Sequence, residues 1–382
     1  MYKFRIYPSR KQKVKIINSL KTCKQIYNGL LALSIDSYKF GGVTLTRSDY
    51  NIMLKDYKGQ IHSQVAQNVR DRLIGSYTNF FRRVKEHAKE KGFPRYKSRV
   101  NSITYPQSGF KFINDRHIKV SKIDNLPIIL HRVPRGKIKT MTIKQNKAGQ
   151  WFATFACEIP NIEVKHPSNK SVGIDMGLEN FAVLSDGTSI PNPRHLIKSE
   201  SKIKRLQRRL SRKVKGSANR RKARFKLARQ HLKVVNIRTD WLHKLSRSLT
   251  IRYGVIAVEK LNIKDMLHNH HLAKSINDAS WGQFLRMIPY KAVISGGIIK
   301  EVEAKGTTSE CFCGQKVDMP LSKRIFHCPS CGFVEHRDIK ASYSICDRAG
   351  LARISTPVDD CVRPSLKAAV CEAGTTYGST SS

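Results

Sequence analysis

The stretch Ser171-Val172-Gly173-Ile174-Asp175-Met176-Gly177 decides the fold of the second half of this chain. It is a short apolar run that ends in an aspartate flanked by glycines. The run from Phe181 to Gly187 predicts a second strand, closed by a turn at Asp186-Gly187. We therefore expect a hairpin that holds the Asp175 carboxylate at a strand end, where small neighbours let a ligand come close.

The charge balance of the chain indicates a polyanionic partner. Its 382 residues include 71 Lys and Arg against 28 Asp and Glu, a formal net charge of +43. Self-repulsion at this charge opposes compaction, and nucleic acid relieves it through phosphate contacts and counterion release. A membrane surface is the alternative partner. However, no apolar run reaches the ~18–20 residues of a spanning helix, and no signal peptide opens the chain.

Alternating and helical patterns organise the first part of the chain. Residues 2–7 predict a strand that Pro8 ends. Ser9 and Gln12 have the spacing of a capping box, which predicts a helix start. A second helical pattern runs from Val65 to Phe81. The buried face of the first helix is expected to carry Val14, Ile17, Leu20 and Ile26 or Tyr27.

Short strand patterns follow from Ile103 to Ile159, with turn residues between them. We interpret them as a small β-barrel that the N-terminal strand closes, with the helices of roughly residues 9–95 inserted into it. Further along, the segment from Val255 to Leu261 predicts a buried strand of a parallel sheet from its continuous apolar run, and this strand ends in Glu259.

Polar side chains of the second helix and the loop after it are candidate nucleic-acid contacts. Amides and arginines read base edges, and a basic loop with aromatic residues suits backbone contacts and base stacking. A solvated helix face is the alternative interpretation. The candidates are Gln64, Gln67, Asn68 and Arg70 on the helix and Arg95, Tyr96 and Lys97 in the loop.

The most basic segment lies between residues 198 and 233, with sixteen Lys and Arg and a single acid, Glu200. An apolar stripe interrupted at Gly216-Ser217 predicts a helical hairpin. Like charges four residues apart destabilise an isolated helix. The basic face opposite the apolar stripe is therefore better explained by a bound polyanion than by solvent exposure alone. The candidate contacts are Arg205, Arg208, Arg209, Arg212, Arg220 and Arg221.

Four cysteines form a candidate metal site, Cys311, Cys313, Cys328 and Cys331. Four thiolates at this spacing are typical of one structural zinc ion in a ribbon. The first pair is C-x-C rather than C-x-x-C, and His327 or His336 could replace one thiolate. Clustered cysteines without a disulfide framework favour a reducing compartment. We therefore expect a prokaryotic cytoplasmic protein that is nucleoid-associated when bound to DNA.

Two later acids occupy positions that resemble that of Asp175. Glu259 ends a buried strand, and Asp338 falls in the first turn of a predicted helix just after the cysteines. Taken singly, these are a strand terminus and an acid favoured by the helix dipole. Together, the three acids match the way a ribonuclease H-like fold holds two divalent ions for phosphodiester hydrolysis, and carboxylates are the ligands that Mg²⁺ prefers.

The order of these motifs resembles the TnpB family, which insertion sequences encode and which is related to type V CRISPR effector nucleases. The resemblance covers the chain apart from its last residues. Besides the cysteine cluster, the matching runs are Tyr2 to Pro8, Gly92 to Lys97, Gly173 to Gly177, Val258 to Asn262 and Arg337 to Ala341.

This resemblance implies an RNA-guided DNA endonuclease. A guide RNA from the transposon end would bind the basic surfaces, with one protein on each RNA. Double-stranded DNA with a short transposon-adjacent motif would be the target. Asp175, Glu259 and Asp338 carry over as catalytic acids that bind two Mg²⁺ ions, and Gln64, Gln67 and Asn68 fall where a motif-reading helix is expected.

The implied fold is α+β and multidomain. It comprises a wedge-like β-barrel, an inserted helical recognition domain, a ribonuclease H-like (RuvC) α/β nuclease domain with an inserted zinc ribbon, and a flexible tail. The expected bounds are residues 1–8 and 96–165 for the barrel, 9–95 for the helical insert, 170–305 and 335–349 for the nuclease domain, 306–334 for the ribbon and 350–382 for the tail.

Some residues depart from the family pattern. His336 stands where the family often has Asp, and Lys340 where it often has Asn, in addition to the C-x-C pair. Three other functions stay open: a nuclease-inactive guided repressor, a transposase that joins DNA ends, and a structural nucleic-acid-binding protein with a zinc ribbon. The three intact acids argue against the repressor, because such a protein has no reason to keep them.

Overall fold

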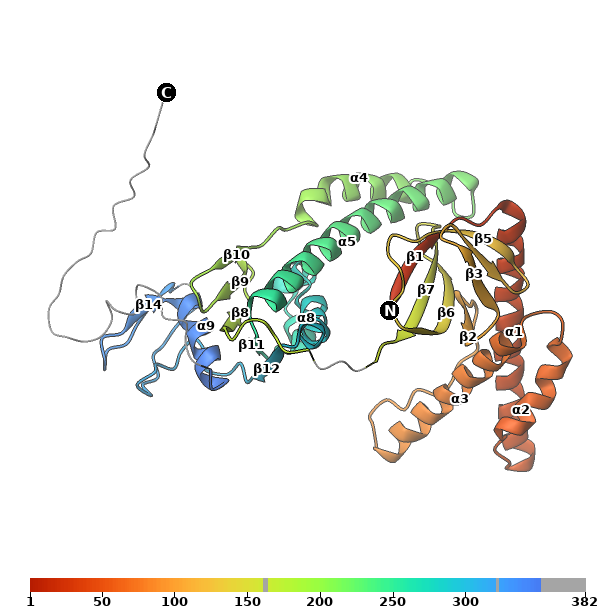
Figure 1. Cartoon of the computed structure of the whole chain (residues 1–382), viewed down its shortest axis with the longest axis horizontal. Helices are drawn as coiled ribbons and strands as arrows, with labels where there is room; N and C mark the ends of the chain where they lie inside the picture. The colour runs from red at the N-terminus through yellow and green to blue at the C-terminus, as the bar shows by residue number, and fades with distance from the viewer. Residues whose placement is uncertain (161–163, 321–322, 352–382) are drawn as a thin grey trace, which may run out of the picture. The chain divides into compact units, whose positions relative to one another are not determined.

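The computed structural model describes residues 1–160, 164–320 and 323–351 (Figure 1). The chain divides into two compact units, Met1–Ile162 with Leu206–Leu232 and Glu163–Arg205 with Lys233–Ser382. The finer domain bounds stay a prediction, and the expected tail lies almost wholly outside the described residues. None of the helices in the described ranges is long and apolar enough to span a bilayer.

A seven-stranded antiparallel sheet is the centre of the first unit. Its strands follow the order β2-β6-β7-β1-β5-β4-β3 (Figure 1). The strands are β1 (Tyr2–Ile6), β2 (Ser102–Pro106), β3 (Phe110–Asn114), β4 (His117–Val120), β5 (Asp124–Ile129), β6 (Lys137–Gln145) and β7 (Trp151–Glu158). The expected strands are present, with one more at residues 102–106.

The prediction that the N-terminal strand closes a barrel is wrong. Strand β1 lies in the middle of the sheet, between β7 and β5, and β2 and β3 form its two edges. No strand pairing joins these two edges in the described part of the chain, and side chains make contacts across the open sheet. Tyr105 of β2 donates its hydroxyl to the Ser121 carbonyl at 3.0 Å, and Phe112 of β3 contacts Phe155 of β7 at 5.2 Å between ring centres. The sheet is therefore a half-barrel.

Three helices pack beside this sheet, α1 (Arg10–Gly41), α2 (Arg47–Leu54) and α3 (Ser63–Lys85), with a 3₁₀ turn η1 (Lys55–Tyr57). The predicted capping box of Ser9 and Gln12 is confirmed at the start of α1. The Gln12 side chain also donates to the Asn125 carbonyl at 2.6 Å, which attaches the helix to the sheet. The C-cap at Gly42 is left-handed, with φ +63°, as glycine allows.

The predicted buried face of α1 is partly wrong. Val14 and Ile17 are exposed, whereas Ile16, Cys23 and Leu30 are buried. The buried residues of α1 are Ile16, Ser19, Cys23, Ile26, Tyr27, Leu30 and Leu31. They repeat every three or four positions, so the stripe is helical but runs through a neighbouring set of residues from the predicted one.

A five-stranded mixed sheet is the centre of the second unit, in the order β10-β9-β8-β11-β12. Strand β8 (Ser171–Asp175) pairs antiparallel with β9 (Asn180–Leu184) and parallel with β11 (Val255–Glu259). The predicted hairpin and the parallel strand are thereby confirmed. The outer strands are β10 (Ser189–Pro191) and β12 (Ile298–Val302), and β12 is parallel to β11.

Helices cover both faces of this sheet. On one face, Val172 and Ile174 pack in a core with Leu242 of α5 and Phe284 of α8. On the other face, Ala257 packs with Ile345 of α9. The helices from residue 197 to residue 351 are the 3₁₀ turn η2 (Ile197–Ser199), α4 (Glu200–Ser211), α5 (Ala218–Arg252), α6 (Ile263–Met266), α7 (His270–Ala279), α8 (Trp281–Ser295) and α9 (Arg337–Arg348). The end of α4 and the start of α5, within Leu206–Leu232, belong to the first unit.

The run between β12 and α9 carries the cysteines and a small hairpin, β13 (Ile325–His327) with β14 (Val334–His336). After this segment the chain returns to the five-stranded sheet, where α9 packs on β8. At that contact the strand has Gly173, and an added Cβ would overlap the Ser342 carbonyl and lie 2.9 Å from the Cys346 backbone nitrogen. Only glycine fits this approach without moving the helix.

We predict that Gly173→Ala destabilises the protein by roughly 1–3 kcal/mol, because the added methyl group must push α9 from β8. Thermal and denaturant unfolding would measure the change. Gly75→Ala is a matched control, because Gly75 lies in α3 with nothing within 4 Å of the added carbon. That change should stabilise by about 0.5–1 kcal/mol. Equal effects of the two substitutions would contradict the packing argument.

Candidate functional site

The three predicted acids come from elements that meet at one edge of the five-stranded sheet. Asp175 is the last residue of β8 and Glu259 the last residue of β11. These strands are parallel neighbours, with Ile174 opposite Val258, so their carboxyl ends lie side by side. Asp338 is in the first turn of α9, the helix that packs on β8.

The pKa of Asp175 is affected by both other carboxylates. Burial, followed by the charges of Glu259 and Asp338, raises the pKa of Asp175 to about 8. The Met176 N–H and the Arg337 side chain act in the opposite direction and are weaker. Burial also raises the pKa of Glu259. A cation would stabilise the ionised form of this group, because it offsets the repulsion between the carboxylates.

The three carboxylates lie farther apart than the ligand atoms of the cysteine cluster. Among the described residues, the only group of three or more His, Cys, Asp or Glu with ligand atoms all within 4.8 Å of one another is the cysteine cluster. The three carboxylates are therefore spread more widely. Carboxylate oxygens are the ligand type that Mg²⁺ and other hard divalent ions prefer.

The four cysteines have the geometry of a zinc site. Cys311 Sγ lies 3.6 Å from Cys331 Sγ, and Cys313 Sγ lies 3.6 Å from Cys328 Sγ. A tetrahedral zinc with Zn–S bonds of about 2.3 Å requires sulfur atoms about 3.8 Å apart. The sulfur atoms of Cys311 and Cys313 therefore lie close to the distances that a tetrahedral zinc requires, although the pair is C-x-C. The cluster is consistent with one structural zinc whose four ligands leave no position for substrate.

The two histidines near the cluster lie outside it. The ligand group contains only the four cysteines. His336 instead is the N-cap of α9, where its Nδ1 accepts the Asp338 N–H at 3.4 Å. An aspartate at this position would accept the same bond, so the departure from the family pattern keeps the helix cap next to the third acid.

The predicted nucleic-acid contacts differ in how accessible they are. The exposed ones are Gln67, Arg95, Tyr96, Lys97, Arg205, Arg208, Arg209, Arg212 and Arg221. Gln64 is half-buried and its Oε1 accepts the Ser108 N–H at 3.0 Å. Asn68 is half-buried too.

Two of the arginines make contacts inside the first unit. The interpretation that Arg70 lies on the exposed polar face of its helix is wrong, because Arg70 is 6% exposed, pairs with Asp71 at 2.8 Å and donates to Asn51. Arg220 is half-buried and donates to the Leu210 and Lys213 carbonyls. It thereby caps the end of α4.

Two basic cavities in the first unit include predicted contacts. Arg209, Lys222 and Lys226 line a cavity of 210 Å³ between α4 and α5. Arg95 and Lys97 line a second cavity of 390 Å³ with Asn79 and Arg83 of α3. Both are lined by cations and amides, which suits phosphate and base contacts.

Comparisons with known proteins identify the family. The OrfB_IS605 family model, described as "Probable transposase", matches residues 154–270, and a "Cas12f1-like, TNB domain" model matches residues 281–345. The chain is 30% identical over 380 residues to a "Putative RNA-guided DNA endonuclease" of Streptomyces pristinaespiralis, an alignment that covers 95% of this chain and 92% of that protein. The chain belongs to the TnpB/IS605 OrfB family.

Further similarities accompany this TnpB-family assignment. The chain is 28% identical over 372 residues to the "Putative RNA-guided DNA endonuclease InsQ" of Escherichia coli (strain K12), with 90% of each chain covered. A solved Cas12f1–sgRNA–target DNA complex contains a chain that is 15% identical with a TM-score of 0.35, covering 90% of this chain and 97% of that one. A TM-score this low supports no conclusion about the site.

A third family model, described as a helix-turn-helix domain, matches residues 1–42 of this TnpB-family chain. The structure describes all of these residues, and they form strand β1 and the single helix α1. The second helix of such a motif is therefore not formed within the matched range. Residues 1–42 instead supply the central strand and the first helix of the first unit.

The sequence of this TnpB-family chain did not indicate that two residues, Thr307 and Lys340, belong to the surroundings of Glu259. Thr307 donates its hydroxyl to Glu259 Oε1 at 2.6 Å, and Lys340 donates to the Thr307 carbonyl at 2.9 Å. Thr307 lies in a loop without periodicity, so no pattern indicates its role. For Lys340 one sequence feature was informative, because a charged residue there falls among the residues expected to be buried in a helix.

We predict that purified protein contains about one zinc per chain, and that Cys328→Ser lowers the zinc content and the thermal stability. Cys328 is fully buried in the small core of the ribbon with Phe326. Elemental analysis and thermal unfolding would measure both effects. Cys157→Ser is the control, because Cys157 lies outside the cluster and should keep the zinc. A folded protein without zinc would contradict the assignment.

Proposed function

We propose that this chain is an RNA-guided DNA endonuclease that hydrolyses both strands of a DNA duplex next to a short transposon-adjacent motif. The observation that carries the proposal is the convergence of Asp175, Glu259 and Asp338 at one sheet edge. The names of relatives that span the chain support guidance by RNA. The net charge of +43 supports a nucleic-acid partner.

The mixed sheet supports a ribonuclease H-like (RuvC) nuclease domain. A hairpin, two further parallel strands and a helix that crosses the first strand carry the acids, which is the arrangement of that fold. The half-barrel with its helices would then be the wedge and recognition parts, and the cysteine segment the inserted ribbon. A guide RNA from the transposon end would bind one protein through the basic surfaces.

The three acids are the proposed ligands of the divalent ions. The charges of both other acids raise the pKa of Asp175, and Asp175, Glu259 and Asp338 would together hold the divalent ions when these are bound. Two Mg²⁺ ions bound there would stabilise the attacking and leaving oxygens of an in-line displacement at phosphorus. The buried surroundings of Glu259 and Asp175 keep the ligand oxygens in place and limit their contact with bulk water.

Strand transfer is the rival reaction, and the family description "Probable transposase" is the observation that favours it. The same three acids could hold ions for joining DNA ends, because the two reactions differ in the nucleophile rather than in the ligands. The products separate them. Hydrolysis leaves free DNA ends, whereas joined ends would overturn the endonuclease proposal.

We predict that Asp175→Ala abolishes cleavage of a guided, motif-bearing duplex, while binding of RNA and target DNA persists. The side chain is proposed to help hold the divalent ions, and the cationic surfaces proposed to bind nucleic acid lie elsewhere in the chain. Gel assays of cleavage and binding would measure the two properties. Asp240→Ala is the control, because Asp240 is an exposed acid of α5 paired with Lys244. Cleavage at the parental rate by Asp175→Ala would remove the catalytic assignment.

We also predict that Asp175 releases a proton when Mg²⁺ is added to the metal-free protein. Its pKa is raised to about 8, so the carboxyl is mostly protonated below that pH and must ionise to bind a cation. Mg²⁺ affinity should therefore increase with pH through the pKa of about 8 and become constant only well above it. Calorimetry in buffers of different ionisation enthalpy would count the protons. Asp175→Asn should show no such release, and a pH-independent affinity in the parent would contradict the prediction.

A further inference from the structure

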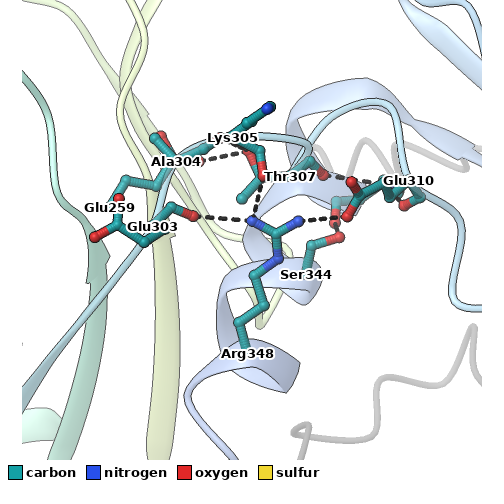
Figure 2. A network of polar contacts seen from close by, with 9 residues as sticks. Glu259, Glu303, Ala304, Lys305, Thr307, Glu310, Ser344 and Arg348 are labelled. Carbon is teal, nitrogen blue, oxygen red and sulfur yellow. Dashed lines mark hydrogen bonds and ion pairs between the residues drawn. The ribbon is translucent and has the colours of Figure 1, made fainter. Parts of the chain in front are cut away.

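The Glu259 carboxylate has a buried hydrogen-bond partner outside its own sheet (Figure 2). Thr307 Oγ1 lies 2.6 Å from Glu259 Oε1 and 3.1 Å from the Ala304 carbonyl. The exposed fractions are 3% for Thr307 and 8% for Glu259. A hydroxyl has one hydrogen to donate, and the shorter, charge-assisted bond to the carboxylate is the stronger of the two.

A buried lysine of α9 holds Thr307 from the other side. Lys340 Nζ donates to the Thr307 carbonyl at 2.9 Å and also to the Glu310 carbonyl. Lys340 is fully buried, with its Nζ 4.7 Å from the centre of the Phe326 ring. A buried ammonium group needs such acceptors, so the lysine and the backbone at Thr307 fix each other's position.

The connection that contains Thr307 is attached to α9 at a second point (Figure 2). Arg348 donates to the Glu303 and Lys305 carbonyls at 2.9 and 2.6 Å, and it pairs with the Glu310 carboxylate at 2.7 Å. Three backbone or side-chain acceptors for one guanidinium restrict the path of the connection. Thr307 therefore reaches Glu259 from a segment that α9 holds in place.

We propose that Thr307 is a positioning residue for Glu259 and that Lys340 acts through it. The proposal rests on the function proposed above, because it takes Glu259 as a ligand of the divalent ions. The hydroxyl bonds to Oε1 and restrains the carboxylate rotamer, and Oε2 would then be available to a divalent ion. Helix α9 then serves both sides of the site: it carries Asp338 itself, and through Lys340 and Thr307 it orients Glu259.

The direct test is Mg²⁺ binding by the full-length protein, with Thr307→Val beside Thr307→Ser. Valine keeps the branched shape without the hydroxyl, and serine keeps the hydroxyl without the methyl group. Calorimetry should show a dissociation constant for Mg²⁺ roughly 10–100 times higher for valine, as for other partners of metal ligands, and a value close to the parent for serine. The Mg²⁺ concentration for half-maximal cleavage should shift in parallel, with target binding unchanged.

Two outcomes would overturn the positioning role. One is parental Mg²⁺ affinity in Thr307→Val. The other is an equal loss in both variants, because the methyl group and its packing would then matter rather than the hydroxyl. Thr250→Val is the matched control, since Thr250 is 2% exposed and its hydroxyl donates to the Ser246 carbonyl within α5. It should keep the parental affinity.

Glu259→Gln and Asp175→Ala distinguish this proposal from the proposed function. If both lose Mg²⁺ binding and cleavage while Thr307→Val does not, only the positioning role fails. If neither changes Mg²⁺ binding or cleavage, the proposed function itself fails.

Lys340→Met tests the route through Thr307, because methionine keeps much of the buried stem and removes the ammonium group. It should also raise the Mg²⁺ dissociation constant. In the double variant with Thr307→Val, the loss should be no greater than for Thr307→Val alone, since residues that act through one contact are not additive. Additive losses would show that Lys340 does not act through Thr307.

Discussion

The acidic site depends on the close packing of helix α9 against strand β8. Gly173 has no side chain, so the Ser342 carbonyl and the Cys346 backbone nitrogen occupy space that a Cβ would fill. Ser185 completes the contact from the neighbouring strand, because its hydroxyl accepts the Gly173 N–H at 2.9 Å and lies 3.2 Å from Cys346 Sγ. Since α9 carries the third acid in its first turn, this backbone approach sets how near that acid comes to the first.

The electrostatics of the site differ from those of other buried acids in the chain. Asp278 lies near the guanidinium of Arg238, at 3.6 Å, and Asp186 pairs with Arg252 at 2.9 Å. No such ion pair determines the pKa of Asp175; burial and the charges of two further carboxylates raise it instead. A chain with 71 cationic residues could pair these acids as well. Their grouping opposes ionisation and is stabilised once a divalent cation is bound.

Sequence reasoning succeeded where the controlling interactions are local. The hairpin at Asp175 follows from glycines and a turn within a few residues, and the parallel strand at Glu259 follows from an uninterrupted apolar run. Closure of the barrel and the buried face of α1 depend on how distant segments meet. Val14 and Ile17 form a plausible stripe, but the neighbouring stripe is the one that contacts the core. Thr307 acts across a loop, and no periodic pattern records such a contact.

The cysteine segment explains how the chain returns from β12 to α9 with the third acid in place. Its own buried core consists of little more than Cys311, Phe326 and Cys328, and so small a core needs a metal to hold it. Zinc bound by four thiolates would carry a net charge of about −2. Lys340 is buried beside the Phe326 ring of this core, and its ammonium group also fixes the loop at Thr307. The residue beside the cysteine cluster is therefore the same one that supports the partner of Glu259, so the cluster and the acidic site share a structural support.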